Sequence, residues 1–258
     1  MPAVSRLTSF KVKRQQPYKP VFSAMIEKRS FDSLGKFDAD WLAARYHFSF
    51  SGYHDPKRVN WGALRVWNDD TIQPKTGFPP HPHSDMEIIT YVRTGAITHQ
   101  DSMGNKGRTE AGDVQVMSAG SGVTHAEYNL EDDATTLYQI WILPKARGGK
   151  PFWGAAKFPK SDRAGALVTL ASGFDDDQKS GALPIRQDAR VLAATLEKGQ
   201  SVSYPLGADR FAYVAVAKGE AKVNGVSLGA RDGAAIRDET ELRIEAGDDA
   251  EIVLVDAP

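Results

Sequence analysis

The fold of this 258-residue chain is decided by two short stretches, FPPHPH at residues 78–83 and SAGSGVTHAE at residues 118–127. Successive side chains of a β-strand point to opposite faces, so the first stretch places His81 and His83 on one face. A single His-x-His pair is a weak sign of a metal site, because most such histidines are surface or hydrogen-bonded core residues. The second stretch strengthens the case.

His125 and Glu127 repeat this spacing in the second stretch, with Ala126 on the opposite face. Two strands of this kind that face each other would surround one ion with three imidazoles and a carboxylate. Positions would remain open to water or substrate, and this donor set is typical of non-haem iron or a similar divalent metal. The candidate metal ligands are therefore His81, His83, His125 and Glu127.

The remaining histidines lack this arrangement. All six histidines of the chain precede residue 126, so any imidazole chemistry belongs to the first half. We expect His47, His54 and His99 to be structural, because none of them has a partner at ligand spacing. One metal ion per chain is the resulting prediction.

Most of the chain outside these stretches has the pattern of an all-β protein. Residues 86–92 and 137–142 are rich in β-branched and aromatic side chains, and turn residues recur about every eight to twelve positions. Asn224-Gly225 suits a two-residue hairpin turn, because both residue types tolerate a positive φ. Many short strands joined by such turns predict a sandwich or a barrel.

A short helix near the start is the main exception that the sequence predicts. It spans residues 38–45, where Asp38 caps the first turn and Trp41, Leu42 and Arg45 follow helical spacing. Almost everything after it is expected to be strand and turn.

Composition divides the chain into four parts. Residues 1–24 form a basic extension without acidic residues, which we expect to be dispensable for folding; the alternative is a targeting peptide. Residues 146–160 are interrupted by glycine and proline and are expected to form a linker. They separate an N-terminal domain at 25–145, which holds the metal site, from a C-terminal domain at 161–258, which does not. A rough pattern of strands and turns shared by the two halves predicts a duplicated β-domain.

Composition also argues against several classes of protein. Lys and Arg number 32 and Asp and Glu 33, and a net charge of −1 argues against direct binding to nucleic acid or a membrane surface. Cysteine is absent, which excludes disulfides, thiolate metal sites and cysteine nucleophiles. The sequence has neither an apolar run of membrane-spanning length nor the pattern of a secretory signal. We expect a cytoplasmic monomer.

The motifs around the candidate ligands resemble a known family. The general cupin motifs are matched by His81-x-His83, Glu87, Gly95, Gly112 and His125-x-x-x-Asn129. The two stretches at 78–83 and 118–127 resemble the pirin family more specifically. Similarity to the bacterial pirin-like quercetin 2,3-dioxygenases is carried by RYHFSF at 45–50, HQDSMGN at 99–105 and YQIW at 138–141. The resemblance runs from about Met25 to the C-terminus and is most specific between residues 81 and 129.

This resemblance implies two tandem cupin barrels, each a jelly roll (double-stranded β-helix), with one metal ion in the N-terminal barrel. The ligands of the family fall, residue by residue, on His81, His83, His125 and Glu127. The general cupin pattern would instead use Glu87, which lies roughly 13 Å beyond His83 along an extended strand, whereas Glu127 is about half that distance from His125. We therefore choose Glu127 and expect Glu87 to support the site or to form a surface pair.

The resemblance also implies a function. It predicts a metal-dependent dioxygenase that opens the heterocycle of a flavonol such as quercetin with O₂ and releases carbon monoxide, so that the partners are a small aromatic or enolic substrate and O₂. Fe(II) is the metal that we expect, while Ni, Cu, Mn, Co and Zn fit the same ligands. Glu127 is the candidate catalytic base. The alternatives are a non-enzymatic metal-binding pirin that acts as a regulatory protein partner, and a cupin that acts on another enolisable small molecule.

Overall fold

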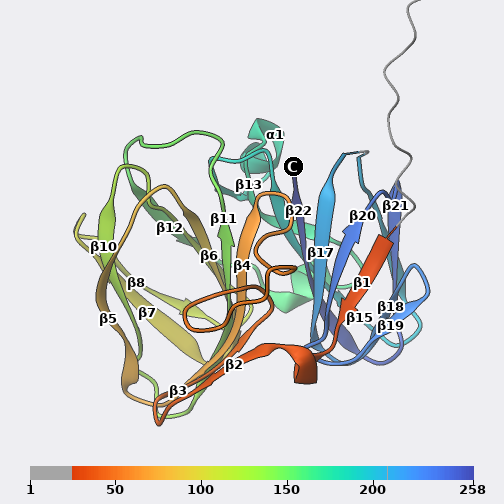
Figure 1. Cartoon of the computed structure of the whole chain (residues 1–258), viewed down its shortest axis with the longest axis horizontal. Coiled ribbons are helices and arrows are strands. Elements are labelled where there is room, and N and C mark those ends of the chain that lie inside the picture. Colours follow the sequence, from red (N-terminus) through yellow and green to blue (C-terminus); the bar gives the residue numbers. More distant parts are fainter. Residues whose placement is uncertain (1–24, 208) are drawn as a thin grey trace, which may run out of the picture.

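The computed structural model describes residues 25–207 and 209–258, so the basic extension expected at residues 1–24 lies outside the described residues. The described chain forms two β-barrels side by side (Figure 1). Each barrel combines a seven-stranded sheet with a four-stranded sheet. The prediction of an all-β protein with two tandem jelly-roll barrels is confirmed.

The first barrel contains two sheets. Its seven-stranded sheet has the order β12 (Phe152–Ala156), β9 (Val114–Ser118), β6 (Glu87–Thr94), β11 (Thr135–Ile142), β4 (Leu64–Ile72), β3 (Leu42–Tyr46) and β2 (Gly35–Asp38). Its four-stranded sheet has the order β5 (Thr76–His83), β10 (Val123–Asn129), β7 (Ala96–Asp101) and β8 (Lys106–Glu110). The strands predicted around 86–92 and 137–142 are confirmed as β6 and β11.

The second barrel repeats this arrangement. Its seven-stranded sheet has the order β1 (Met25–Arg29), β20 (Gly233–Arg237), β17 (Phe211–Lys218), β22 (Ala250–Ala257), β15 (Arg190–Leu196), β13 (Val168–Ser172) and β14 (Leu183–Pro184). Its four-stranded sheet has the order β16 (Ser201–Pro205), β21 (Glu241–Ala246), β18 (Ala221–Val223) and β19 (Val226–Leu228). Matching sheets in the two halves support the predicted duplication.

In the part of the chain that the structure describes, helix is confined to short pieces. They are the 3₁₀ turns Phe31–Ser33 and Lys160–Arg163 and the helix α1 (Asp175–Lys179). Within residues 25–207 and 209–258, none of the helices has the length and apolar character needed to cross a bilayer.

The largest apolar core lies between the two seven-stranded sheets, and strand β22 shows how it forms. Every residue of this strand is buried. Val253 and Val255 point into the shared core, while Ile252 and Leu254 point into the interior of the second barrel. A strand buried on both faces has no polar side to alternate with, which explains its nearly continuous apolar sequence. The shared core joins the barrels into one packed body.

Strand β1 belongs to the second barrel, although it lies at the start of the described chain. It precedes every strand of the first barrel, yet it pairs with β20 of the second, with Met25 opposite Arg237. The first strand of the segment predicted as the N-terminal domain, residues 25–145, therefore completes the sheet of the other barrel. The reason is the free edge of β20, which β1 covers with antiparallel hydrogen bonds.

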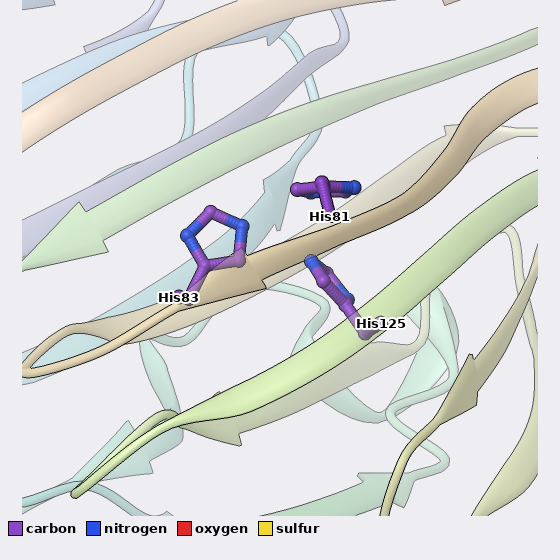
Figure 2. A group of neighbouring side chains, drawn as sticks. All are labelled: His81, His83 and His125. Carbon is purple, nitrogen blue, oxygen red and sulfur yellow. The ribbon is translucent and has the colours of Figure 1, made fainter.

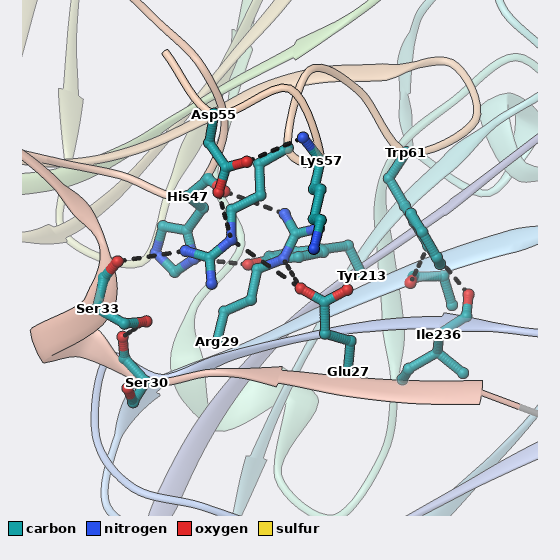
Figure 3. A network of polar contacts seen from close by, with 12 residues as sticks. Glu27, Arg29, Ser30, Ser33, His47, Asp55, Lys57, Trp61, Tyr213 and Ile236 are labelled. Carbon is teal, nitrogen blue, oxygen red and sulfur yellow. Dashed lines mark hydrogen bonds and ion pairs between the residues drawn. The ribbon is translucent and has the colours of Figure 1, made fainter. Parts of the chain in front are cut away.

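A buried polar network fixes this crossing (Figure 3). Arg29 donates a hydrogen bond from Nη1 to the carbonyl oxygen of His47 at 3.0 Å, and its guanidinium lies over the ring of Phe48. His47 Nδ1 meets the hydroxyl of Tyr213 on β17 at 2.7 Å. Burial, and then the charge of Arg29, hold the pKa of His47 well below its usual value. This histidine therefore serves the interface between the barrels.

The prediction of a helix at residues 38–45 is wrong. Strand β2 ends at Asp38, and strand β3 follows after a tight turn. In β3 the residues Leu42, Ala44 and Tyr46 are buried and alternate with partly exposed neighbours, which is a period of two. Pairing with both β2 and β4 overrides the helical propensity of this segment.

The segment predicted as a linker at 146–160 contains a regular strand. Strand β12 pairs with β9 over five residues, with Trp153 opposite Met117. Gly154 lies within this edge strand and Pro151 directly precedes it, and both are positions where an edge strand accepts these residues. The Asn224-Gly225 hairpin behaves as predicted, because both residues have positive φ and they join β18 to β19.

Candidate metal centre

The strands that carry the predicted ligands lie side by side in the small sheet of the first barrel (Figure 2). Strand β10 pairs with β5, so that His125 stands opposite His81 and Val123 opposite His83. The three imidazole rings face one another, with centroids 4.4 Å apart for His81 and His125, 4.8 Å for His81 and His83, and 5.0 Å for His83 and His125. One nitrogen of each ring lies within 4.8 Å of the others. The structure therefore brings three of the four predicted ligands together.

An irregularity in β5 shapes this cluster. The pairing shifts between His125, opposite His81, and Glu127, opposite Phe78, which leaves one extra residue on β5. A bulge of this kind changes the face to which the following side chains point. Phe78 and His81 consequently line the same cavity although they are three residues apart. The prolines between them fit because β5 is an edge strand.

The histidine nitrogens show where an ion would bind. Nε2 of His83 and Nε2 of His125 are buried and have no hydrogen-bond partner among the described residues. His81 is held from behind, because its Nδ1 contacts the carbonyl oxygen of Pro79 at 2.8 Å. Burial, and then the neighbouring imidazoles, lower the pKa of His83 to about 4 and that of His125 to about 3. Both rings are therefore neutral at pH 7, which is the form that binds a metal. A divalent cation fits this set of unpartnered donors.

Glu127 lies beside the cluster and lines the same cavity. Its carboxylate is fixed by three donors: Gln139 to Oε2 at 2.5 Å, and Gln115 and Thr90 to Oε1 at 2.6 and 3.2 Å. A carboxylate oxygen of Glu127 lies within 4.8 Å of nitrogens of His99 and His125, whereas the group formed with His81 and His83 does not include it. Its role as the fourth ligand stays a prediction.

Glu87 does not line this cavity. Its Oε1 accepts a hydrogen bond from the hydroxyl of Ser118 at 2.8 Å, and burial raises its pKa. The side chain is 1% exposed, so the predicted alternative of a surface pair is wrong.

His99, which was expected to be structural, lies in contact with the predicted ligand His125. It is fully buried on β7, and its Nδ1 lies 3.3 Å from Nδ1 of His125. Its other nitrogen, Nε2, contacts Oδ2 of Asp101 at 3.0 Å. The spacing His-x-Asp, which places both side chains on one face of a strand, was the available signal. His54, by contrast, is exposed and lies outside the clusters.

The cluster opens into a cavity of about 250 Å³. Its apolar wall is formed by Phe50, Phe78, Ile88 and Trp141. Trp141 meets the ring of His83 edge-on at 4.9 Å and the ring of Phe50 at 5.3 Å. An apolar pocket with a few convergent polar groups is the usual form of a small-molecule site.

Two polar side chains of β4, Asn68 and Asp70, also line the cavity and were not predicted. Each is buried, and each has an Oδ1 without a hydrogen-bond partner among the described residues. Burial, and then the carboxylates of Asp69 and Glu127, hold the pKa of Asp70 well above its usual value. No motif around β4 marked these residues as part of a site.

Comparison with known proteins agrees with this architecture. The pirin family model matches residues 27–142, and a model described as the quercetinase C-terminal cupin domain matches residues 170–257. A pirin-like protein of Caulobacter vibrioides is 65% identical over 233 residues, which cover 90% of this chain and all of that protein. Quercetin 2,3-dioxygenase of Escherichia coli K12 is 40% identical and covers 91% of this chain and 99% of its own length.

Solved structures give the same result. The crystal structure of YhhW from Escherichia coli superposes with a TM-score of 0.86 at 39% identity, covering 91% of this chain and 98% of that one. The same bacterial pirin in complex with nickel(II) superposes with a TM-score of 0.85, covering 91% of this chain and 99% of that one. Fold and histidine cluster together define a two-barrel cupin protein of the metal-binding kind. On the evidence of these relatives, the chain belongs to the pirin family.

Proposed function

We propose that the protein is a metal-dependent dioxygenase of the quercetinase type, which opens the heterocycle of a flavonol with O₂ and releases carbon monoxide. The observation that carries the proposal is the pair of buried, unpartnered Nε2 atoms of His83 and His125, next to His81, at an apolar cavity. A relative of 40% identity carries the name quercetin 2,3-dioxygenase, which supports the same reaction class.

The proposed metal ligands are His81, His83, His125 and Glu127, with one ion per chain. Three neutral imidazoles and one carboxylate leave a divalent cation with net positive charge, and Fe(II) is our choice among the metals that such a set accepts. When bound, the ion would attract a flavonol oxygen and lower the pKa of the hydroxyl that binds it.

Glu127 is the proposed base for the flavonol proton. It is 3% exposed, and donors from Thr90, Gln115 and Gln139 hold its carboxylate in one orientation. A general base needs a fixed position within reach of the proton that it takes, and these contacts supply it. If its carboxylate loosens from the ion, one carboxylate oxygen becomes free to accept the flavonol proton, while the three amide and hydroxyl donors keep the group in place.

The cavity walls fit an aromatic substrate that carries hydroxyl groups. The rings of Phe50, Phe78 and Trp141 offer surface against which a flat aromatic molecule packs and from which water is excluded. The unpartnered Oδ1 atoms of Asn68 and Asp70 would accept hydrogen bonds from substrate hydroxyls. An entirely apolar ligand would leave both oxygens buried without a partner, which costs about 1–3 kcal/mol for each.

The test combines metal analysis with a turnover assay. Protein loaded with Fe(II) should consume O₂ and bleach quercetin near neutral pH, with carbon monoxide among the products. Free Fe(II) in the same buffer and the His125→Ala variant are the controls, because flavonols oxidise slowly without an enzyme. Equal rates for the protein and for His125→Ala would remove the proposal.

A further inference from the structure

A line of buried polar side chains runs away from the cavity behind His125. Its members are His99 and Asp101, both on β7, which pairs with β10. In this pairing Asp101 stands opposite His125, and His99 stands opposite Glu127. The side chains of His99 and Asp101 are completely buried. None of the roles proposed above uses these two residues.

The hydrogen bonds that Asp101 accepts determine which nitrogen of each histidine carries the proton. Oδ1 of Asp101 accepts the backbone N–H groups of Met103 and Asn105 at 2.9 and 3.0 Å, and Oδ2 accepts the side-chain amide of Asn105 at 2.9 Å. A carboxylate with these donors is an acceptor, so the 3.0 Å contact with His99 requires a proton on Nε2 of His99.

The next step follows from the two tautomers of imidazole. A neutral His99 with a proton on Nε2 has a bare Nδ1. Nδ1 of His125, at 3.3 Å, must then donate the hydrogen bond between the rings. Nε2 of His125 is consequently bare, and this is the buried nitrogen without a partner at the metal cluster.

The ring of His99 is also held in place from one side. It stacks on Trp153 of β12, with centroids 4.9 Å apart and an angle of 10° between the planes. Trp153 in turn lies against Gly107, where an added Cβ would approach the indole to 2.2 Å. Strand β12, within the segment expected to be a linker, thus supports the orientation of His99.

We propose that His99 and Asp101 are positioning residues for the metal centre: they hold His125 in the tautomer whose Nε2 is free to bind the ion. The inference rests on the proposed metal site but not on the proposed dioxygenase reaction. Histidine ligands commonly donate their other N–H to a neighbouring acceptor, and loss of such a partner costs about 10–100-fold in metal affinity. Here the acceptor is a second imidazole, itself oriented by a carboxylate.

Asp101→Asn tests the direction of the proton line. The asparagine keeps an oxygen for the two backbone donors and presents an NH₂ group to His99 and to Asn105, whose side-chain amide can rotate to offer its oxygen. That change favours the opposite tautomer of His99 and so places a proton on Nε2 of His125. We expect nickel(II) to bind the metal-free variant about 10–100-fold more weakly in calorimetric titrations of the full chain. Gln100→Ala, on the outer face of the same strand, is the matched control and should bind like the unaltered protein.

A second pair of variants tests the proposal even if Asp101→Asn does not fold. His99→Leu removes both hydrogen bonds and should weaken nickel(II) binding by about 10–100-fold. His99→Gln offers a donor and an acceptor on one planar group, and it should lose less than about tenfold. Equal losses in these two variants, with equal thermal stability, would overturn the proposal, because a merely structural role would not distinguish them.

Long-range ¹H–¹⁵N spectra of the metal-free protein read the tautomers directly. We expect His125 to carry its proton on Nδ1 and His99 to carry its proton on Nε2. In Asp101→Asn we expect each proton on the other nitrogen of its own ring, that is, on Nε2 of His125 and on Nδ1 of His99. A proton on Nε2 of His125 in the unaltered protein would overturn the proposal. So would two equivalents of nickel(II), because His99, His125 and Glu127 would then form a second metal site. Absence of quercetin turnover, with these results as expected, would count against the dioxygenase proposal alone.

Discussion

The two barrels share one arrangement of strands and differ in what those strands enclose. Strand β10 lies between β5 and β7 in the first barrel, as β21 lies between β16 and β18 in the second. The buried side chains of β10 are Val123, His125, Glu127 and Asn129, and those of β21 are Leu242, Ile244 and Ala246. The difference extends to the neighbouring strand, where β16 offers Val202 and Tyr204 in place of the two histidines of β5.

This contrast separates two uses of the same scaffold. Apolar side chains that fill the second barrel stabilise the folded state, because they are removed from water. The polar residues of the first barrel lose hydration when they are buried, so they need partners; Glu127 has three hydrogen-bond donors, and His125 has His99. We infer that most of the free energy of unfolding comes from the second barrel and the shared core, because the interior of the first barrel holds a cavity and polar side chains.

The largest effect that this comparison predicts is the loss of metal from His125→Ala. Removing an inward imidazole from β10 should reduce the metal content from one equivalent to none. Far-ultraviolet circular dichroism should stay unchanged, because the shared core is apolar and includes none of the residues that line the cavity. Elemental analysis after incubation with Fe(II) measures it. Full metal content in the variant would show that the ion does not depend on this strand.

Ile244→Ala makes the corresponding change in the second barrel and should have the opposite outcome. Ile244 is fully buried, and truncation of such a residue costs about 2–5 kcal/mol of unfolding free energy. Urea unfolding should show this loss, and metal content should remain one equivalent per chain. Loss of metal without loss of stability would contradict the division of roles.

Glu127→Gln and Glu87→Gln sharpen the comparison within the first barrel. We expect the first variant to bind nickel(II) about 10–100-fold more weakly, since a proposed anionic ligand becomes a neutral amide. Glu87→Gln should bind normally, because Glu87 does not line the cavity. The reverse ranking in titration calorimetry would assign the carboxylate ligand to Glu87.

The smallest expected effect is the response of the metal-free protein to acid. Burial gives His83 a pKa of about 4, below the usual 6.5, so the unfolded chain binds more protons between these values. Unfolding free energy should therefore fall as the pH drops from about 6.5 to about 4 and rise again as the pH is restored. His83→Gln should show a shallower slope in denaturant titrations across this range. An identical slope would mean that His83 is not buried in the neutral form.

Strand periodicity was sufficient to predict the centre of the site. Alternation alone placed His81 and His83 on one face, and the structure shows that their rings meet that of His125. It could not show the extra residue on β5 that brings Phe78 into the same cavity. That depends on pairing between strands more than forty residues apart, which no local pattern records.

The features that the sequence did not predict have a common physical origin. Residues 38–45 satisfy a helical pattern and also a period of two, and only the neighbouring strands β2 and β4 decide between them. Strand β12 forms among glycines and prolines because β9 offers it an edge. Asn68 and Asp70 belong to the cavity through the position of β4 in the sheet. In each case tertiary contacts decided what the local sequence left open.

The crossing of β1 has a consequence for the order in which the protein forms. The first described strand finds its partner, β20, more than 200 residues later in the chain. While the chain is being synthesised from its N-terminus, β1 must wait without that partner until nearly the whole protein has been made. Contacts between residues so far apart slow the search for the native state. The protein therefore completes its fold only when β1 pairs with β20, near the end of the chain, and a cut between the barrels would leave β1 on a separate piece from its partner.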